Sequence, residues 1–233
     1  NADQKTYPAS TTKIMTAILA LENGNLDDEF MVGEEVLGSI TRFTAYSSLM
    51  GIQPGETLTL RDLVYGLMLA SGNDAAEAIA VHIGGSISGF VSMMNQKAVE
   101  LGMTGTHFTN PHGIQNDDHY TTARDMTKLF AYALQNETFV KIAETTSYTV
   151  PANSVRPTEL ELKNTDLLLH EATGATISTV YPYAIAGKTG DTDVAGKCLV
   201  AAAQREGARV IVALFGDKAD LDNNDTELTK IAR

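Results

Sequence analysis

Three short patterns of reactive side chains occur once each along the chain. They are Ser10-Thr11-Thr12-Lys13, Ser71-Gly72-Asn73 and Lys188-Thr189-Gly190. At ordinary residue frequencies, about one S-x-x-K and about 0.05 K-T-G are expected by chance in a chain of this length, so only the last pattern is informative alone. Their order, and the positions at which they fall, make all three candidates for one active site.

The first pattern pairs a nucleophile with a base. A serine hydroxyl is a weak nucleophile at neutral pH and needs a base within hydrogen-bond reach. Spacing of three on a helix places Lys13 on the same face as Ser10. Ile14, Met15 and Ala17 surround the lysine with apolar groups, and because desolvation disfavours an ammonium, we expect its pKa to fall far enough for a base. The alternative is a helix-start serine with a solvated lysine one turn on.

The other two patterns supply groups that bind a peptide and move a proton. Ser71 and Asn73 sit between two predicted helices, where a hydroxyl can relay a proton to a leaving amine and an amide can donate to a substrate carbonyl. Lys188 and Thr189 at a strand edge can bind a terminal carboxylate, and Gly190 lets a peptide backbone lie close. The alternatives are a helix C-cap with polar neighbours and an exposed strand end.

The sequence predicts helices in the first two thirds of the chain. One begins near Pro8, carries Ser10 in its first turn and ends at Gly24. Two capping boxes, Thr59 with Asp62 and Thr122 with Asp125, begin helices that run to about residues 70 and 135. Asp74 is expected to cap a helix over 75–83, and Ser88 one over 89–101. The long loop over 103–120 is typical of a functional loop.

The last third changes to strand periodicity. Residues 197–204 and 208–215 are apolar runs separated by Arg205-Glu206-Gly207, which predicts a hairpin, and 183–188 predicts a further strand. We therefore expect a mixed α/β chain with residues 1–233 forming one catalytic domain of two interleaved lobes. The α/β lobe would comprise about 1–24 and 145–233, and the helical lobe about 55–144.

Charge and composition limit the classes of function. The chain has 17 Lys+Arg against 29 Asp+Glu, a formal charge of −12, which argues against a nucleic-acid partner because such proteins carry a basic face. No apolar run reaches the roughly 18 residues of a membrane span. The first ten residues lack the features of an export signal, so any signal is expected to have been removed or never present.

With their flanking strings, the three motifs resemble those of the penicillin-recognising serine acyltransferases, in particular the low-molecular-mass D-alanyl-D-alanine carboxypeptidases. The strings are YPASTTKIMTA, LMLASGNDAA, FTNPHGI with HYTTARDM, and AGKTGDTDVAGKCLVAAA, and the resemblance covers essentially the whole chain. It implies a β-lactamase/transpeptidase-like fold, with an antiparallel sheet lobe packed on a mostly helical lobe and the site between them. The family's N-terminal strands, C-terminal domain and amphipathic anchor are expected to be missing, so any membrane contact would be through missing segments.

The resemblance also implies a role for each motif residue. Ser10 would be the acylated nucleophile and Lys13 its base, with Ser71 as proton relay. Asn73 would contact the substrate amide, and the substrate carboxylate would be held by Lys188 and Thr189, next to Gly190. The backbone N–H groups of Ser10 and Asp191 would form the oxyanion hole. The substrate would be a peptidoglycan stem peptide ending in D-Ala-D-Ala, β-lactam antibiotics would acylate the same serine, and no metal or cofactor would take part. The location would be outside the cytoplasmic membrane, where peptidoglycan lies.

Two departures from the family pattern bear on function. Members usually have an aromatic residue or histidine where this chain has Asp191, and a carboxylate there would repel an anionic substrate unless it points away or is paired. Many members also carry an arginine after the hairpin's second strand, whereas Lys218 is the only cation over 216–224. Both motivate the alternative of a poorly catalytic penicillin or wall-fragment sensor.

Two further alternatives rest on other residues. A class A-like β-lactamase needs a Glu-x-x-Leu-Asn loop for deacylation, and the nearest candidates, Glu159, Glu161 and Asn164, have the wrong spacing. A metal hydrolase is suggested by a group of loop residues whose spacing fits no helical metal motif. These residues are His107, His112, His119, Asp117 and Asp118.

Overall fold

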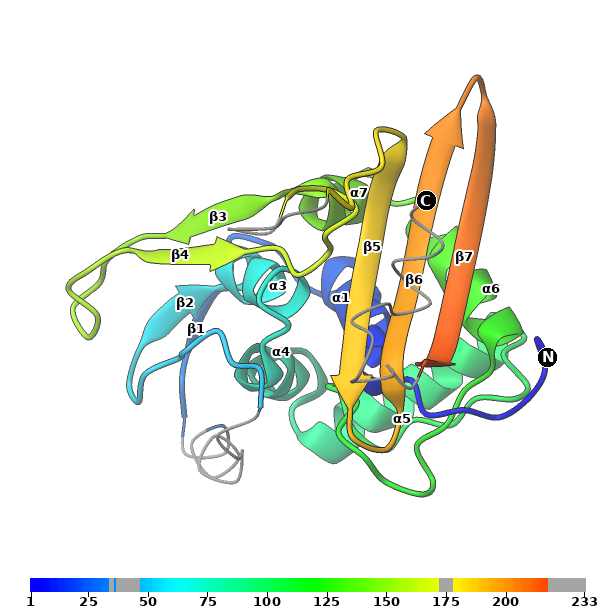
Figure 1. The fold of residues 1–233 in the computed structure, drawn as a ribbon. Helices are drawn as coiled ribbons and strands as arrows, with labels where there is room; N and C mark the ends of the chain where they lie inside the picture. The colour runs from blue at the N-terminus through cyan, green and yellow to red at the C-terminus, as the bar shows by residue number, and fades with distance from the viewer. Residues whose placement is uncertain (34–35, 37–46, 172–177, 218–233) are drawn as a thin grey trace.

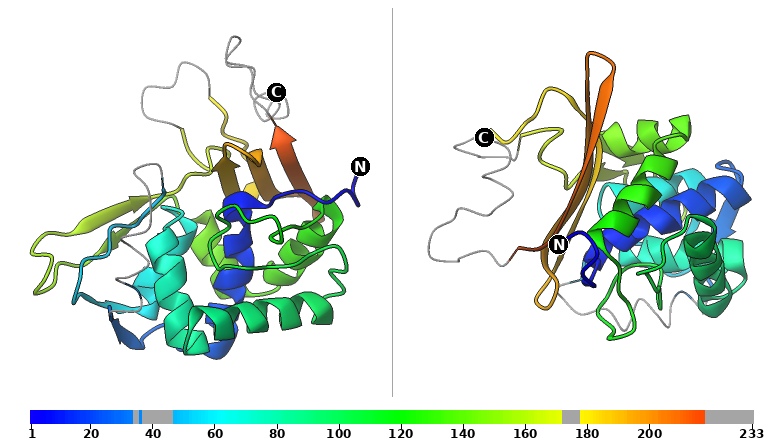
Figure 2. Two further views of the ribbon diagram at one scale, coloured as in Figure 1. Left: turned by 90° about the horizontal axis from the view of Figure 1, so that it is seen from below. Right: turned by 90° about the vertical axis from the view of Figure 1, so that its right-hand side faces the viewer.

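A three-stranded antiparallel sheet lies against a layer of helices in this computed structural model (Figure 1). The structure describes residues 1–33, 36, 47–171 and 178–217. Seen along its edge, the sheet has the described helices on one of its faces (Figure 2). Of the described helices, none alone is long and apolar enough to span a membrane, although the pair α4 (Asn73–Gly84) and α5 (Ile87–Glu100), bent by 85°, passes the length and composition test together.

The helical layer is built around α1 (Lys13–Asn23), which follows a 3₁₀ turn, η1 (Ala9–Thr12). Every residue of α1 from Lys13 to Ala20 is buried, as expected for a helix in the centre of a core. The other helices pack around it or under the sheet. They are α3 (Leu60–Met68), α4, α5, α6 (Ala123–Ala133) and α7 (Glu137–Glu144).

The sheet has the strand order β5 (Ala184–Thr192), β6 (Gly196–Arg205), β7 (Ala208–Asp217). The predicted hairpin is confirmed: β6 and β7 pair antiparallel and are joined through Glu206 and Gly207, both at positive φ, as a two-residue hairpin turn requires. β5 is longer than the predicted strand and contains the whole K-T-G pattern. The expected mixed fold with an antiparallel sheet is confirmed, and the division into two lobes stays a prediction.

Two small ribbons and one helix were not predicted from the sequence. β1 (Glu29–Met31) pairs with β2 (Thr57–Thr59), and β3 (Ser147–Val150) pairs with β4 (Leu160–Lys163). These strands are only three or four residues long, too short for a clear alternation of polar and apolar residues. The unpredicted helix is α7.

Two predicted helix caps are wrong. α4 begins at Asn73 after Gly72, so Asp74 lies inside the helix. Its carboxylate instead accepts hydrogen bonds from the backbone N–H groups of residues 50–52 and of residue 75. For α5 the cap is Ser86, whose Oγ accepts from Gly89 N, and not Ser88. The Asp74 carboxylate is thus engaged by the backbone of residues 50–52, and the observed cap of α5 lies two residues before the predicted one.

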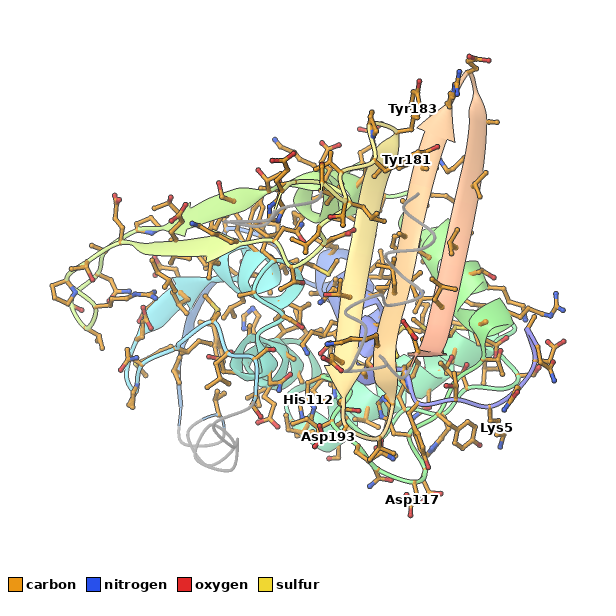
Figure 3. The ribbon with its side chains drawn as sticks, viewed as in Figure 1. Lys5, His112, Asp117, Tyr181, Tyr183 and Asp193 are labelled. Atoms are coloured by element: carbon orange, nitrogen blue, oxygen red, sulfur yellow. The ribbon has the colours of Figure 1, made fainter. Side chains whose placement is uncertain are left out.

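A cavity of about 360 Å³ lies on the sheet face away from the helices. It is lined by Tyr181, Tyr183 and Leu168 and by the outward side chains of the strands, including Val210, which is 59% exposed. Figure 3 shows both tyrosines at the opposite end of the sheet from His112. No motif residue lines this cavity, although Leu199, which does line it, is the cross-strand neighbour of Thr189.

The capping box at the start of α3 gives a test of local stability. Thr59 Oγ1 accepts from Asp62 N, and the Asp62 carboxylate accepts from Thr59 N. We expect Thr59→Ala to lower the free energy of unfolding by about 1 kcal/mol, because an orphaned helix N–H loses its acceptor. Urea denaturation measures this loss. Thr59→Ser keeps the oxygen and should retain most of the stability, and equal losses in both variants would contradict a capping role.

Candidate active site

Ser10 and Lys13 face each other at the start of the central helix. Ser10 lies in η1, and Lys13 is the first residue of α1. A 3₁₀ turn has three residues per turn, so side chains three apart lie directly above one another. Lys13 Nζ is accordingly 2.9 Å from Ser10 Oγ. The structure brings the pair within hydrogen-bond distance through a tighter turn than the predicted α-helix.

Lys13 is 0% exposed, which excludes a solvated lysine. Its Nζ lies 2.7 Å from Asn73 Oδ1 and 2.9 Å from the backbone oxygen of His112. Burial lowers the pKa of Lys13 well below its usual value, and the positive charge of Lys188 lowers it further. A neutral amine that donates to Asn73 and His112 keeps its lone pair for the Ser10 hydroxyl. The geometry therefore suits proton transfer from Ser10 to Lys13.

The backbone is strained at both serine motifs. Ala9, immediately before the first serine, has φ of 47°, and Ser71 has φ of 57°. Left-handed backbone at a residue other than glycine costs on the order of 1–3 kcal/mol and is concentrated at functional sites, where surrounding contacts impose it. At Ser71 this conformation is combined with 5% exposure. Ser71 thus has a left-handed backbone two residues before α4 begins.

The second and third motifs are joined by a hydrogen bond. Lys188 is 1% exposed, and its Nζ donates to Ser71 Oγ at 3.1 Å and to Thr189 O at 3.0 Å. Burial lowers the pKa of Lys188 to about 7. Since the Ser71 oxygen accepts from Lys188, its own hydrogen can point to another group. The expected role of Lys188 in holding the substrate carboxylate stays a prediction, and in this structure its ammonium group contacts Ser71 and Thr189.

β5 runs alongside the nucleophile backbone. A Cβ at Gly190 would lie 3.0 Å from Ser10 N and 3.1 Å from Ala9 Cβ, so a larger residue would force the strand away. The close approach places the backbone of residues 190–191 next to that of Ser10. The oxyanion hole from the N–H groups of Ser10 and Asp191 stays a prediction.

The Asp191 carboxylate has a partner. Lys197 lies directly opposite on β6, and the two side chains form an ion pair. Both side chains are about half exposed, 55% for Asp191 and 43% for Lys197. The charge that was expected to repel an anionic substrate is therefore offset by its cross-strand neighbour. Lys218 lies outside the described residues.

The loop between α5 and α6 supplies contacts to the site. His119 Nδ1 accepts from Thr109 N at 3.0 Å, and its Nε2 lies 2.9 Å from Thr12 Oγ1. Burial lowers the pKa of His119 to about 3, so its ring is neutral. Figure 3 shows His112 beside the end of β5 and Asp117 at the outer edge of the loop. In the part of the chain that the structure describes, no three His, Cys, Asp or Glu residues are grouped to hold a metal ion.

The candidates for a β-lactamase deacylation loop have other surroundings. Asn164 Nδ2 donates to the backbone oxygens of Ala143 and Thr145 at the end of α7. Glu161 is exposed on β4, where it pairs with Lys163. Asn164 thus ties the end of β4 to the end of α7, and Glu161 lies on the surface of the β3–β4 ribbon.

Three contributions to the site were missed by sequence reasoning. The His112 backbone oxygen is an acceptor for Lys13, Thr165 Oγ1 lies 2.7 Å from Thr189 Oγ1, and Asp166 is buried behind β5. None of them falls in a short motif, and each depends on a loop that returns from far along the chain. No local signal in the sequence identifies them.

The fold is that of the DD-peptidases, as comparison with solved structures shows. The D-alanyl-D-alanine carboxypeptidase from Mycobacterium tuberculosis H37Rv superposes with a TM-score of 0.84 at 32% identity, covering 100% of this chain and 81% of that one. The DD-transpeptidase of Streptomyces K15 gives 0.82 at 35% identity, covering 94% and 83%. The chain itself belongs to the D-alanyl-D-alanine carboxypeptidase family, peptidase family S11, whose pattern it matches over residues 1–219.

The resemblance stated from the motifs is thus confirmed. A curated relative, the D-alanyl-D-alanine carboxypeptidase DacF of Bacillus subtilis, is 34% identical over 236 residues, which cover 99% of this chain. The chain spans 56% of the length of that relative.

Proposed function

We propose that this chain is the catalytic domain of a serine D-Ala-D-Ala carboxypeptidase that removes the terminal D-alanine from peptidoglycan stem peptides. The observation that carries the proposal is the fully buried Lys13, whose Nζ lies 2.9 Å from Ser10 Oγ. Family membership supplies the substrate class. Because peptidoglycan lies outside the cytoplasmic membrane, the enzyme would act there. The reaction would need only groups of this chain and water.

Acylation follows from the positions of four side chains. The Ser10 hydroxyl gives its proton to Lys13 as its oxygen attacks the carbonyl carbon of the penultimate D-alanine. The new ammonium is held by acceptors on Asn73 and His112. The peptide C–N bond breaks as the leaving D-alanine nitrogen takes the Ser71 proton, which Lys13 replaces directly or through water. The products are an ester on Ser10 and free D-alanine.

Deacylation reverses the roles with water as the nucleophile. Lys13, neutral again, removes a proton from water, which attacks the ester carbonyl, and Ser10 leaves with a proton. A β-lactam is attacked in the same way at its ring carbonyl. Its amine leaving group remains tethered to the acyl group, so it cannot diffuse away, and a long-lived adduct on Ser10 is expected.

The substrate carboxylate would be bound at the edge of β5. Thr189 is partly exposed there, and the Lys188 side chain donates to the backbone oxygen of the same residue. Asn73 Oδ1 is engaged by Lys13, which leaves its Nδ2 to donate to a substrate carbonyl. This arrangement favours a short peptide that ends in a free carboxylate.

The test is release of D-alanine from a peptide that ends in D-Ala-D-Ala, combined with intact-mass measurement after exposure to benzylpenicillin. We expect D-alanine release and a stable penicillin adduct. An adduct without D-alanine release would favour the sensor alternative, and rapid penicillin turnover without peptide hydrolysis would favour a β-lactamase. Loss of activity with EDTA would favour a metal hydrolase.

The ion pair of Asp191 gives a separate prediction. Lys197→Met leaves the Asp191 carboxylate uncompensated near the proposed carboxylate site. We expect KM for the anionic peptide to rise by ~2- to 5-fold at low salt and the effect to shrink at high salt, because exposed charges are screened. The double variant Asp191→Asn with Lys197→Met should restore KM. A KM that stays high in the double variant would show that charge repulsion is not the cause.

A further inference from the structure

Asp166 is a buried carboxylate that the proposed reaction does not use. It is 1% exposed. Its Oδ1 accepts a hydrogen bond from Leu168 N at 3.0 Å, whereas Oδ2 has no hydrogen-bond partner among the described residues. A half-satisfied carboxylate in an interior is costly unless a positive charge compensates it. The negative charge of Asp166 therefore needs a positive charge nearby.

Asp166 lies directly against the strand that carries the K-T-G motif. A Cβ placed on Gly187 would come within 1.8 Å of Asp166 Oδ2, so only glycine lets the carboxylate approach the strand this closely. The preceding residue, Thr165, contacts the Thr189 hydroxyl at 2.7 Å. Thr165 and Asp166 therefore lie against the two β5 residues that flank Lys188.

Lys188 is a buried ammonium group that has no carboxylate within ion-pair distance among the described residues. It is 1% exposed, and its two hydrogen bonds end on neutral oxygens of Ser71 and Thr189. No ion pair within 4.0 Å involves Lys188 in the described ranges. Burial lowers the pKa of Lys188, and the carboxylate of Asp166 opposes that shift. The two groups are thus buried charges of opposite sign on either side of one strand.

We propose that Asp166 is the counter-charge that keeps Lys188 in its ammonium form across β5. It is a positioning residue, because it acts through Lys188 and contacts neither substrate nor nucleophile. The inference rests on the proposed function, since it assigns to Lys188 the charge that attracts the substrate carboxylate and orients Ser71. In a medium of low polarity such a charge acts over more than a contact distance.

The other charged groups around the pair set the direction of the expected pH dependence. Burial raises the pKa of Asp166, whereas Lys188 and His170 lower it. Lys13 must be neutral to act as a base. The charge of Lys188 lowers the pKa of Lys13, whereas the charge of Asp74 raises it. Acylation should therefore need Lys13 neutral and Lys188 charged, which gives a bell-shaped profile with Lys188 on the alkaline limb.

The test is the pH profile of acylation by a fluorescent penicillin in wild type and in Asp166→Asn. The amide keeps the shape and removes the charge, so Lys188 should lose its proton at lower pH. We expect the alkaline limb to move down by about one pH unit, which makes labelling about 10-fold slower at alkaline pH. The acid limb should move little. Asp193→Asn, an exposed residue in the β5–β6 turn, is the matched control and should leave the profile unchanged.

Several outcomes would decide against the proposal. An unchanged alkaline limb in folded Asp166→Asn protein, or an equal change in Asp193→Asn, overturns it. If the variant does not fold, a carbon-13 titration of the Asp166 carboxyl in wild type decides: the proposal expects an ionised carboxylate at pH 7, and a protonated one contradicts it. Wild type that is not labelled by penicillin at any pH contradicts the proposed function instead, so the two failures are distinguishable.

Discussion

Replacing Ser10 by alanine is expected to abolish both penicillin acylation and D-alanine release. Among the residues that the structure describes, the variant removes the one hydroxyl hydrogen-bonded to Lys13 Nζ, since the other two partners are an amide and a backbone oxygen. Loss of the nucleophile in a serine hydrolase reduces turnover by about 10⁴-fold or more. No mass adduct should form, and peptide hydrolysis should fall to the rate without enzyme.

The control for this variant is Ser92→Ala on the exposed face of α5. It removes one hydroxyl far from the site and should retain full labelling. Circular dichroism should show that the Ser10 variant is folded, because the serine contributes one hydrogen bond to Lys13. An adduct in folded Ser10→Ala protein would place the acylated residue elsewhere and would overturn the assignment.

Replacing Lys13 by arginine should stop acylation although the positive charge is kept. A guanidinium stays protonated in proteins and has no lone pair to accept the Ser10 proton. A positioned general base contributes about 10²–10⁴-fold, and we expect the second-order rate of penicillin labelling to fall by that factor. Lys13→Met should show a similar loss for the same reason.

Stopped-flow labelling with a fluorescent penicillin measures this rate. Lys163→Met, an exposed lysine on β4, is the control and should label as wild type does. If Lys13→Arg keeps a normal rate while Lys13→Met does not, then the residue acts as a fixed positive charge and not as a base. That result would contradict the mechanism derived from the buried amine.

The fold could be predicted where the signal is local. The capping box of Thr59 with Asp62 and the hairpin at Glu206-Gly207 are formed within a few residues, and the structure has both. The start of α4 could not be predicted, because the Asp74 carboxylate binds backbone N–H groups more than 20 residues away. The short ribbons depend on partners brought together by the rest of the chain.

The contacts of the site also divide into those that the local sequence predicts and those that it does not. The spacing of Ser10 and Lys13 predicts their contact, and the structure has it at 2.9 Å. The contacts made by His112, Thr165 and Asp166 depend on how loops return to β5 and α1, which no short pattern encodes. The ion pair of Asp191 depends on the register of the β5–β6 hairpin, which places Lys197 opposite it.

The central claim is that Ser10 carries an acyl group derived from a D-Ala-D-Ala substrate and transfers it to water. The most direct measurement is D-alanine release by the wild-type chain from a peptide ending in D-Ala-D-Ala, with the same peptide ending in D-Ala-L-Ala as control. We predict many turnovers per enzyme on the first peptide and little hydrolysis of the second. Inhibition should be complete once one benzylpenicillin molecule is covalently bound to Ser10. Absence of D-alanine release, with penicillin hydrolysed rapidly and no adduct retained, would contradict the account.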